Sequence, residues 1–171
     1  QPQVDTVSGR LCGAEALARW HCTKYGDVSP GEFIPLMEQS GLIIPFGQWI
    51  LSHGMAQCLE WRRSRPDFQI SVNLSYIQLS QGDFISFLRT ALEENSLDPS
   101  RLIMELTETY LAKAEEDTLR MIAQMKELGV KIAMDDFGVG YSSLFSLKSI
   151  PVDVVKIDRG FVKGITSDLF N

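Results

Sequence analysis

Two adjacent carboxylates, Asp135 and Asp136, are the residues of this sequence best placed to do chemistry. They follow residues 131–134, whose apolar residues alternate as in a β-strand, and precede a turn that carries Gly138 and Gly140. Hard divalent cations take oxygen ligands, and an Asp pair can bridge two ions about 3.5–4 Å apart in a hydrolytic site. The alternative is an acidic strand exit with solvated side chains.

On several expected strands, the polar residues alternate with apolar ones and so lie on one face of the strand. These strands cover residues 11–20, 68–75, 101–107, 130–135 and 152–158. If their apolar faces pack against helices, the residues that point inward together are Glu15, Asn73, Glu105, Asp135 and Lys156. Clustered charges would repel one another and lose solvation without a cation, and carboxylate and amide oxygens suit Mg²⁺ or Mn²⁺ better than Zn²⁺. Taken singly, Asn73 could form a turn, Glu105 could cap a helix and Lys156 could neutralise Asp135.

The order of elements predicts how these residues are positioned. Two short strands joined at Ser8-Gly9 open the chain, and helices are expected over residues 30–40, 45–63, 83–94, 111–128 and 142–147. The first helix has Ser29 as its N-cap and Pro30 at its first position, and Gly41 ends it.

Alternating strands and helices predict the α/β class with a largely parallel sheet, and a TIM-like (β/α) barrel with function at the C-terminal strand ends. A full barrel needs about 250 residues. The 171 residues, with about six strands, therefore predict an incomplete barrel or an open sheet.

Composition limits the other possibilities. A chain of 171 residues that is 44% hydrophobic fits one globular domain, and a net charge of −6 without a basic run argues against binding a nucleic-acid polymer. No membrane segment is expected, because no stretch of about 20 apolar residues occurs. The start at Gln1, without Met, suggests a piece of a longer protein. Cys12, Cys22 and Cys58 form no Cys-x-x-Cys pair, so reduced thiols and a cytoplasmic location are expected, although the parent could be membrane-anchored elsewhere.

Five motifs, in order, resemble those of EAL domains, the bacterial cyclic-di-GMP phosphodiesterases. They are EALAR at 15–19, VNLS at 72–75, ELTE at 105–108, DDFGVGYSSL at 135–144 and KID at 156–158. The resemblance covers the chain nearly end to end. It implies a TIM-like barrel with an antiparallel first strand, and hydrolysis of cyclic di-GMP to linear pGpG with two Mg or Mn ions. The letters DFG at 136–138 also occur in kinases, but no Val-Ala-Ile-Lys or His-Arg-Asp motif accompanies them.

The resemblance also implies residue roles. Glu15, Asn73, Glu105 and Asp135 would hold one metal, and Asp135 with Asp136 would serve a second. Catalysis would rest on Lys156, which polarises the attacking water, together with Glu15 and Asp135. Arg19 would contact phosphate, while Gln1 and Leu17 would lie near the guanine. Glu108 would anchor the loop over residues 137–144, which in the family responds to substrate and to dimerisation.

The chain departs from the family by ending at Asn171, whereas EAL domains continue with two more strand–helix units that carry a further Glu and a Gln. We therefore expect residues 1–171 to be a partial EAL phosphodiesterase domain of a longer protein, with weak or absent turnover in this piece. Linked GGDEF or sensory domains and a homodimer through the EAL domain are also expected. The alternatives are a non-catalytic cyclic-di-GMP receptor and a structural module, and the intact ligand motifs favour the enzyme.

Overall fold

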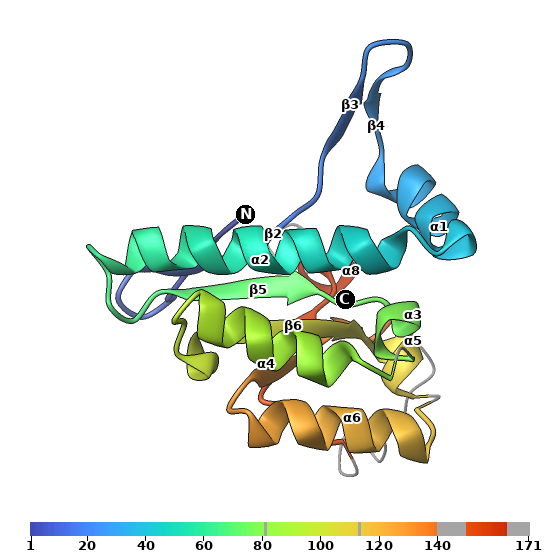
Figure 1. The fold of residues 1–171 in the computed structure, drawn as a ribbon. Helices are drawn as coiled ribbons and strands as arrows, with labels where there is room; N and C mark the ends of the chain where they lie inside the picture. Colours follow the sequence, from blue (N-terminus) through green and yellow to red (C-terminus); the bar gives the residue numbers. More distant parts are fainter. Residues whose placement is uncertain (81, 113, 140–149, 164–171) are drawn as a thin grey trace.

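The computed structural model describes residues 1–80, 82–112, 114–139 and 150–163, and its centre is a curled, half-barrel sheet (Figure 1). Six strands pair in the order β1-β2-β5-β6-β7-β8. They are Pro2–Val4, Leu11–Ala16, Gln69–Asn73, Leu102–Thr107, Lys131–Phe137 and Val154–Ile157. β1 is antiparallel to β2 and every later pair is parallel, which confirms the predicted α/β half barrel with its antiparallel first strand.

Three long helices lie side by side on the outer face of this sheet (Figure 1). They are α2 (Ile43–Arg62), α4 (Phe84–Glu94) and α6 (Glu116–Glu127). The core between helices and strands includes Met55, Leu88, Met104, Met125 and Ile132, each 0% exposed. Burying a side chain of this size contributes about 1.5–3 kcal/mol. Because the apolar residues of each strand face these helices, the intervening polar residues are left on the concave side.

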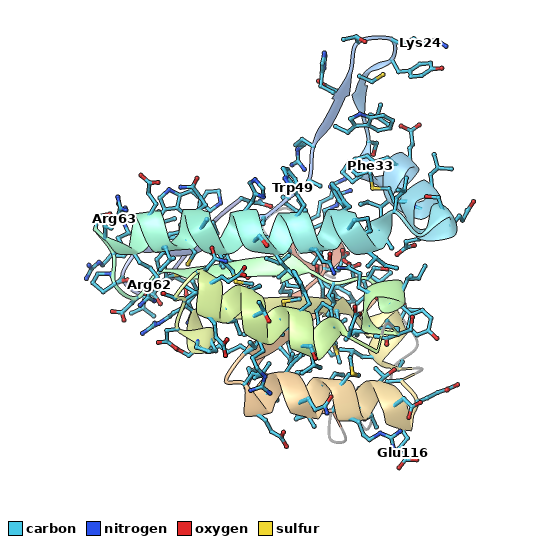
Figure 2. The ribbon with its side chains drawn as sticks, viewed as in Figure 1. Lys24, Phe33, Trp49, Arg62, Arg63 and Glu116 are labelled. Atoms are coloured by element: carbon cyan, nitrogen blue, oxygen red, sulfur yellow. The ribbon has the colours of Figure 1, made fainter. Side chains whose placement is uncertain are left out.

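Local charges complement the helix ends. Figure 2 shows Arg62 at the C-terminal end of α2 and Glu116 at the N-terminal end of α6, where each charge opposes the partial charge of the helix dipole. None of the helices in the described ranges is both long and apolar enough to cross a membrane.

Helix α1 (Pro30–Ser40) begins and ends where the sequence predicts. The Ser29 side chain and Glu32 form a capping box at its start, and Gly41 ends it with φ +75°, a backbone conformation that glycine adopts without strain. The strand predicted over residues 11–20 is wrong in its second half. It ends at Ala16, and the chain then forms a separate hairpin of β3 (Trp20–Cys22) and β4 (Gly26–Val28) that projects from the body, with Lys24 at its tip (Figures 1 and 2).

The helix predicted over residues 111–128 is confirmed as α6 but is wrong at its start, because Leu111 belongs to a separate short helix. A short α5 (Glu108–Leu111) is separated from α6, whose acidic first turn forms its own start. Short helices α3 (Tyr76–Leu79), η1 (Pro99–Arg101) and α8 (Arg159–Val162) were not predicted. The other helices and strands differ from prediction by a few residues at their ends, and the helix predicted over residues 142–147 lies outside the described residues.

Candidate active site

Side chains from four parallel strands meet at the C-terminal edge of the sheet. Glu15 of β2 is paired in register with Ser71 of β5. Glu105 of β6 is paired with Asn73, and Asp135 of β7 with Thr107. Lys156 on β8 completes the group, because its Nζ lies 3.1 Å from Glu15 Oε2, 2.5 Å from Glu105 Oε2 and 2.9 Å from Asp135 Oδ2. The structure thus brings together the inward-facing charged residues predicted from strand parity.

Asn73 joins this acidic cluster (Glu15, Glu105, Asp135 and Lys156) through its side-chain amide. Its Nδ2 donates to Glu15 Oε1 at 2.9 Å, so its Oδ1 faces away from Glu15. That oxygen accepts no hydrogen bond from the described residues and is available as a ligand atom.

Burial sets the electrostatics of the cluster. The Glu105 side chain is 1% exposed and that of Lys156 is 24% exposed. Desolvation raises the pKa of Glu105 in spite of its hydrogen bond and charge attraction to Lys156. Burial by itself would lower the pKa of Lys156, but hydrogen bonds to Glu105 and Asp135 outweigh it and raise the pKa above its ordinary value. The ammonium is therefore charged at neutral pH.

The donor set of the cluster fits a divalent cation. Ligand oxygens of Glu15, Glu105 and Asp135 lie within 4.8 Å of one another. Three carboxylates against one ammonium leave two negative charges without compensation. Glu105 Oε1 is moreover buried and has no hydrogen-bond partner among the described residues. A buried carboxylate oxygen of this kind is expensive unless a cation or donor reaches it. An all-oxygen donor set favours a hard cation.

Asp136 lies outside this group of three carboxylates. It is exposed, with φ +56° at an irregularity in the register of β7 against β8, and its backbone N–H donates to Asp135 Oδ1 at 2.9 Å. Desolvation and the neighbouring charge of Asp135 raise the pKa of Asp136. Its role at a second metal stays a prediction.

A pocket of about 660 Å³ opens beside the acidic cluster, and we call it the cluster pocket. Of the predicted substrate contacts, Leu17 and Arg19 line it together with Asn73 and Asp136. Its volume is within the range typical of small-molecule sites. Gln1 is not among its lining residues; the backbone of Gln1 pairs with that of Glu15, with hydrogen bonds of 2.6 and 2.7 Å.

The predicted loop anchor contacts the start of its loop. Glu108 is 1% exposed, and its Oε2 accepts a hydrogen bond of 2.7 Å from the Gly138 N–H. Gly138 has φ +99°, and a Cβ there would lie 2.4 Å from the Phe161 ring, so another residue would be strained and would clash. Residues 140–144 of the predicted loop lie outside the described residues.

Sequence reasoning missed a second polar group in the cluster pocket. Glu38 of α1, Ser75 and Gln78 of α3 all line its wall. The available signal was the spacing Ser-x-x-Gln at 75–78, the pattern of a capping box, which the structure forms with both hydrogen bonds present.

A curled sheet of parallel strands with an acidic cluster at its C-terminal edge defines a TIM-like α/β protein able to hold a divalent cation. The particular family follows from comparison with known proteins. The model of the EAL domain family matches residues 1–169, and the chain belongs to that family.

Two curated relatives agree with this assignment. The chain is 40% identical over 169 residues to a protein of Pseudomonas aeruginosa named bifunctional diguanylate cyclase/cyclic di-GMP phosphodiesterase MucR, covering 98% of this chain and 25% of the relative. It is 36% identical over 165 residues to cyclic di-GMP phosphodiesterase PdeR of Escherichia coli, covering 96% of this chain and 25% of the relative. The chain thus spans about a quarter of the length of these relatives.

The fold agrees as well. The solved structure described as "PaMucR Phosphodiesterase, c-di-GMP complex" superposes with a TM-score of 0.90 at 40% identity, covering 98% of this chain and 68% of that one.

Proposed function

We propose that this chain carries the catalytic site of a cyclic-di-GMP phosphodiesterase that hydrolyses one phosphodiester bond to give linear pGpG. The observation that carries the proposal is the buried, unpartnered Glu105 Oε1 within a cluster of three carboxylates, beside a pocket of nucleotide size. The names of the relatives MucR and PdeR and of the cyclic-di-GMP complex support the substrate.

The acidic cluster supports one divalent cation, and we assign two Mg²⁺ or Mn²⁺ ions as the cofactors. Glu15, Asn73, Glu105 and Asp135 would hold the first, and Asp135 with Asp136 the second. Bound in this way, such ions would make a water acidic enough to supply hydroxide near neutral pH and would neutralise charge on the phosphate.

The chain's own residues position the reactants. Arg19, an exposed residue of the cluster pocket, would bind a phosphate oxygen of the substrate, because its guanidinium is a fixed cation with several donors. The Lys156 ammonium has three N–H donors, and in this structure they go to Glu15, Glu105 and Asp135. Lys156 would donate one of them to the attacking water once a cation holds those carboxylate oxygens. The water oxygen bonds to phosphorus as the P–O3′ bond breaks, the leaving 3′ oxygen takes a proton, and one 5′-phosphate monoester results.

The wider context is also proposed. Residues 1–171 would be part of an EAL domain in a longer, cytoplasmic protein with linked GGDEF or sensory domains, and the name of the bifunctional relative supports a cyclase domain. The domain would form homodimers, and Glu108 would anchor the loop that responds to dimerisation and to substrate. Gln1 and Leu17 would lie near a guanine base.

The test is hydrolysis of cyclic di-GMP with Mn²⁺ or Mg²⁺, followed by chromatography of pGpG. It compares residues 1–171 with the longer polypeptide that we expect to contain them, and each with its Glu105→Gln variant. We expect turnover in the longer form and a loss in the variant of more than about 100-fold, because a metal-binding oxygen is replaced by an amide.

Glu127→Gln is the matched control, because Glu127 is an exposed glutamate at the C-terminal end of α6 and the substitution changes the same atoms. Tight binding of cyclic di-GMP without turnover in any form would overturn the enzyme proposal and leave a receptor. Absence of both binding and turnover would leave a structural module.

A further inference from the structure

Ser75 joins two polar side chains in the wall of the cluster pocket. Its backbone N–H donates to Gln78 Oε1 at 3.1 Å, and its hydroxyl donates to Glu38 Oε1 at 2.5 Å. Each of the two side chains therefore has its Oε1 bound to Ser75, and its other terminal atom (Nε2 of Gln78, Oε2 of Glu38) is free to bind something else. Because a backbone N–H needs an acceptor, the amide of Gln78 can present only its nitrogen at the free end.

The free end of Gln78 is unusual for a buried group. The residue is 4% exposed, yet its Nε2 donates no hydrogen bond to any described residue. Gln78 Nε2 is not one of the fully buried side-chain atoms that lack a hydrogen-bond partner. It therefore keeps some access to the pocket that Gln78 lines. Gly47 of α2 makes this position possible, because a Cβ at Gly47 would lie 1.8 Å from Nε2. A buried donor without a partner carries a penalty that a ligand acceptor would remove.

The free oxygen of Glu38 complements this donor. Glu38 Oε2 accepts no hydrogen bond from the described residues, and Glu38 lines the same pocket. Hence a donor and an acceptor, both positioned by Ser75, face a pocket that also has apolar side chains in its wall. The apolar residues used here are Leu17, Pro35, Phe46 and Ile50. Flat walls with one donor and one acceptor suit the edge of an aromatic heterocycle.

The order of donor and acceptor distinguishes the purines. Guanine presents an acceptor, O6, beside the donors N1–H and the 2-amino group. Adenine presents the reverse, a 6-amino donor beside the acceptor N1. A Gln78 N–H would bond to O6 of guanine but would oppose the amino group of adenine. A Glu38 carboxylate would accept from guanine N1–H but would repel adenine N1.

We propose that Glu38 and Gln78 form a guanine-reading pair that selects cyclic di-GMP over cyclic di-AMP, an inference that rests on the proposed function of the site. The same pocket is lined at its other end by Asn73 and Asp136, beside the acidic cluster. One base edge therefore lies on the Ser75 wall while the phosphate of the same dinucleotide lies toward the carboxylates. By binding the base, the pair would also position the phosphodiester relative to the acidic cluster.

The test is an exchange of the two groups, Glu38→Gln with Gln78→Glu. The double variant keeps volume, net charge and both acceptors for Ser75, and it reverses the free donor and acceptor. Affinity for cyclic di-GMP and cyclic di-AMP is measured by calorimetry, and the chain's hydrolysis of each is assayed separately. We expect the wild type to prefer cyclic di-GMP by more than about 100-fold, because a site built to bond one edge rejects the opposite pattern strongly.

In the double variant we expect this ratio to fall by about 100-fold or more, with a gain for cyclic di-AMP as well as a loss for cyclic di-GMP. Far-UV circular dichroism checks folding. Gln78→Met, which removes the donor without adding charge, is expected to weaken cyclic di-GMP by about tenfold. An unchanged ratio in the folded double variant would overturn the inference.

The preference for cyclic di-GMP over cyclic di-AMP is measured by binding, so the guanine-reading pair can be tested even if no hydrolysis occurs. A wild type that binds both dinucleotides equally would also overturn the inference, and would leave the proposed hydrolytic function standing if turnover is seen. A wild type that prefers cyclic di-GMP but does not cleave it would overturn the proposed enzyme and leave the guanine-reading pair to be judged by the exchange.

Discussion

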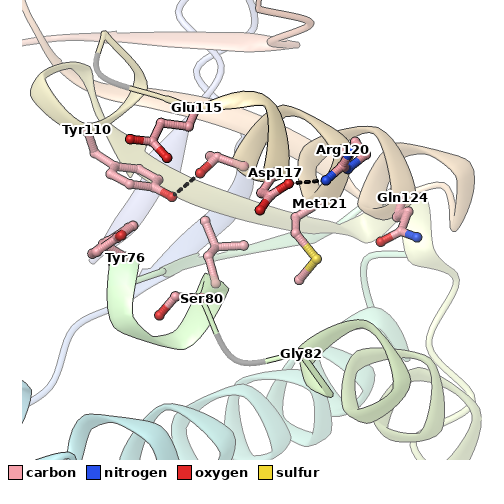
Figure 3. Close-up of a pocket in the computed structure, with 11 residues that line it drawn as sticks. Tyr76, Ser80, Gly82, Tyr110, Glu115, Asp117, Arg120, Met121 and Gln124 are labelled. Carbon is pink, nitrogen blue, oxygen red and sulfur yellow. Dashed lines mark hydrogen bonds and ion pairs between the residues drawn. The ribbon is translucent and has the colours of Figure 1, made fainter.

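Two pockets of nearly equal volume lie on opposite sides of one aromatic pair. The cluster pocket holds about 660 Å³, and a second pocket, between α3 and α6, holds about 620 Å³ (Figure 3). Tyr76 and Tyr110 line both, with ring centroids 5.1 Å apart, and so form the wall between them. Volume therefore does not distinguish the two pockets.

Their polar groups do distinguish them. Beside the cluster pocket, charged residues from distant parts of the chain meet with at most about a quarter of each side chain exposed, and Lys156 is 141 residues from its partner Glu15. In the second pocket the ion pair of Arg120 and Asp117 joins neighbours on one helix, with side chains 66% and 83% exposed. Exposed pairs of this kind contribute about 0–1 kcal/mol. Buried convergence from separate strands, which is costly without a ligand, is what marks a site.

The largest difference in stability between the two pockets should appear when the Lys156 ammonium, at the centre of the acidic cluster, is removed. In Lys156→Met, three carboxylates would remain close together without a positive charge. With a chelator present, we expect a loss of about 2–3 kcal/mol in the free energy of unfolding, below the full value for a buried pair because Lys156 is partly exposed. Urea denaturation measures this loss.

Mg²⁺ should restore more stability to the Lys156→Met variant than it adds to the wild type, because a cation at about 100 times its dissociation constant contributes about 2.7 kcal/mol. Lys24→Met, at the exposed tip of the β3–β4 hairpin, is the control. Equal stability of the Lys156 variant and wild type in chelator would show that the cluster is no more strained than the second pocket.

A smaller effect should follow from changing the wall between the pockets. The Tyr110 hydroxyl shares a hydrogen bond of 3.0 Å with Thr118 Oγ1, on the side of the second pocket (Figure 3). Tyr110→Phe should cost about 1 kcal/mol of stability at pH 8. We expect nucleotide binding in the cluster pocket to be unchanged within about twofold.

The same variant has a pH signature. Burial raises the pKa of Tyr110 above its ordinary value of 10.0, in spite of the bond to Thr118. The folded state then holds the proton more tightly than the unfolded state, so this stability is present below about pH 10 and is lost as pH rises through the folded pKa. The stability difference between wild type and Tyr110→Phe should shrink above pH 10. Tyr25→Phe, an exposed position, should show no such trend; a constant Tyr110 difference would contradict the assignment.

The two pockets were not equally accessible to sequence reasoning. Strand parity placed Glu105 and Lys156 on the concave face because side chains alternate along any strand, whatever its partners. Likewise Ser29 and Pro30 marked the start of α1, because capping depends on residues within one turn. These are local rules, and a local rule can be read from the chain.

The rest depended on contacts between distant residues. That Lys156 Nζ bonds all three carboxylates, rather than one, depends on how far β8 is staggered in the sheet. The contact of Glu38 with Ser75 crosses 37 residues and joins two helices, so no spacing announces it. The β3–β4 hairpin was missed because each of its strands has only three residues, which is too short for an alternating apolar pattern to be recognised.

The smallest effect should come from the most conspicuous polar contact of the second pocket. Arg120 pairs with Asp117 and Glu116 on the surface of α6, and Arg120→Ala should change the free energy of unfolding by no more than about 0.5 kcal/mol. Denaturation at low and high salt should show a difference that vanishes with salt, because exposed charges are screened. Cyclic di-GMP affinity should be unchanged. A large loss of stability or of nucleotide affinity would mean that this helix surface is coupled to the acidic cluster, and that burial is not what separates the two pockets.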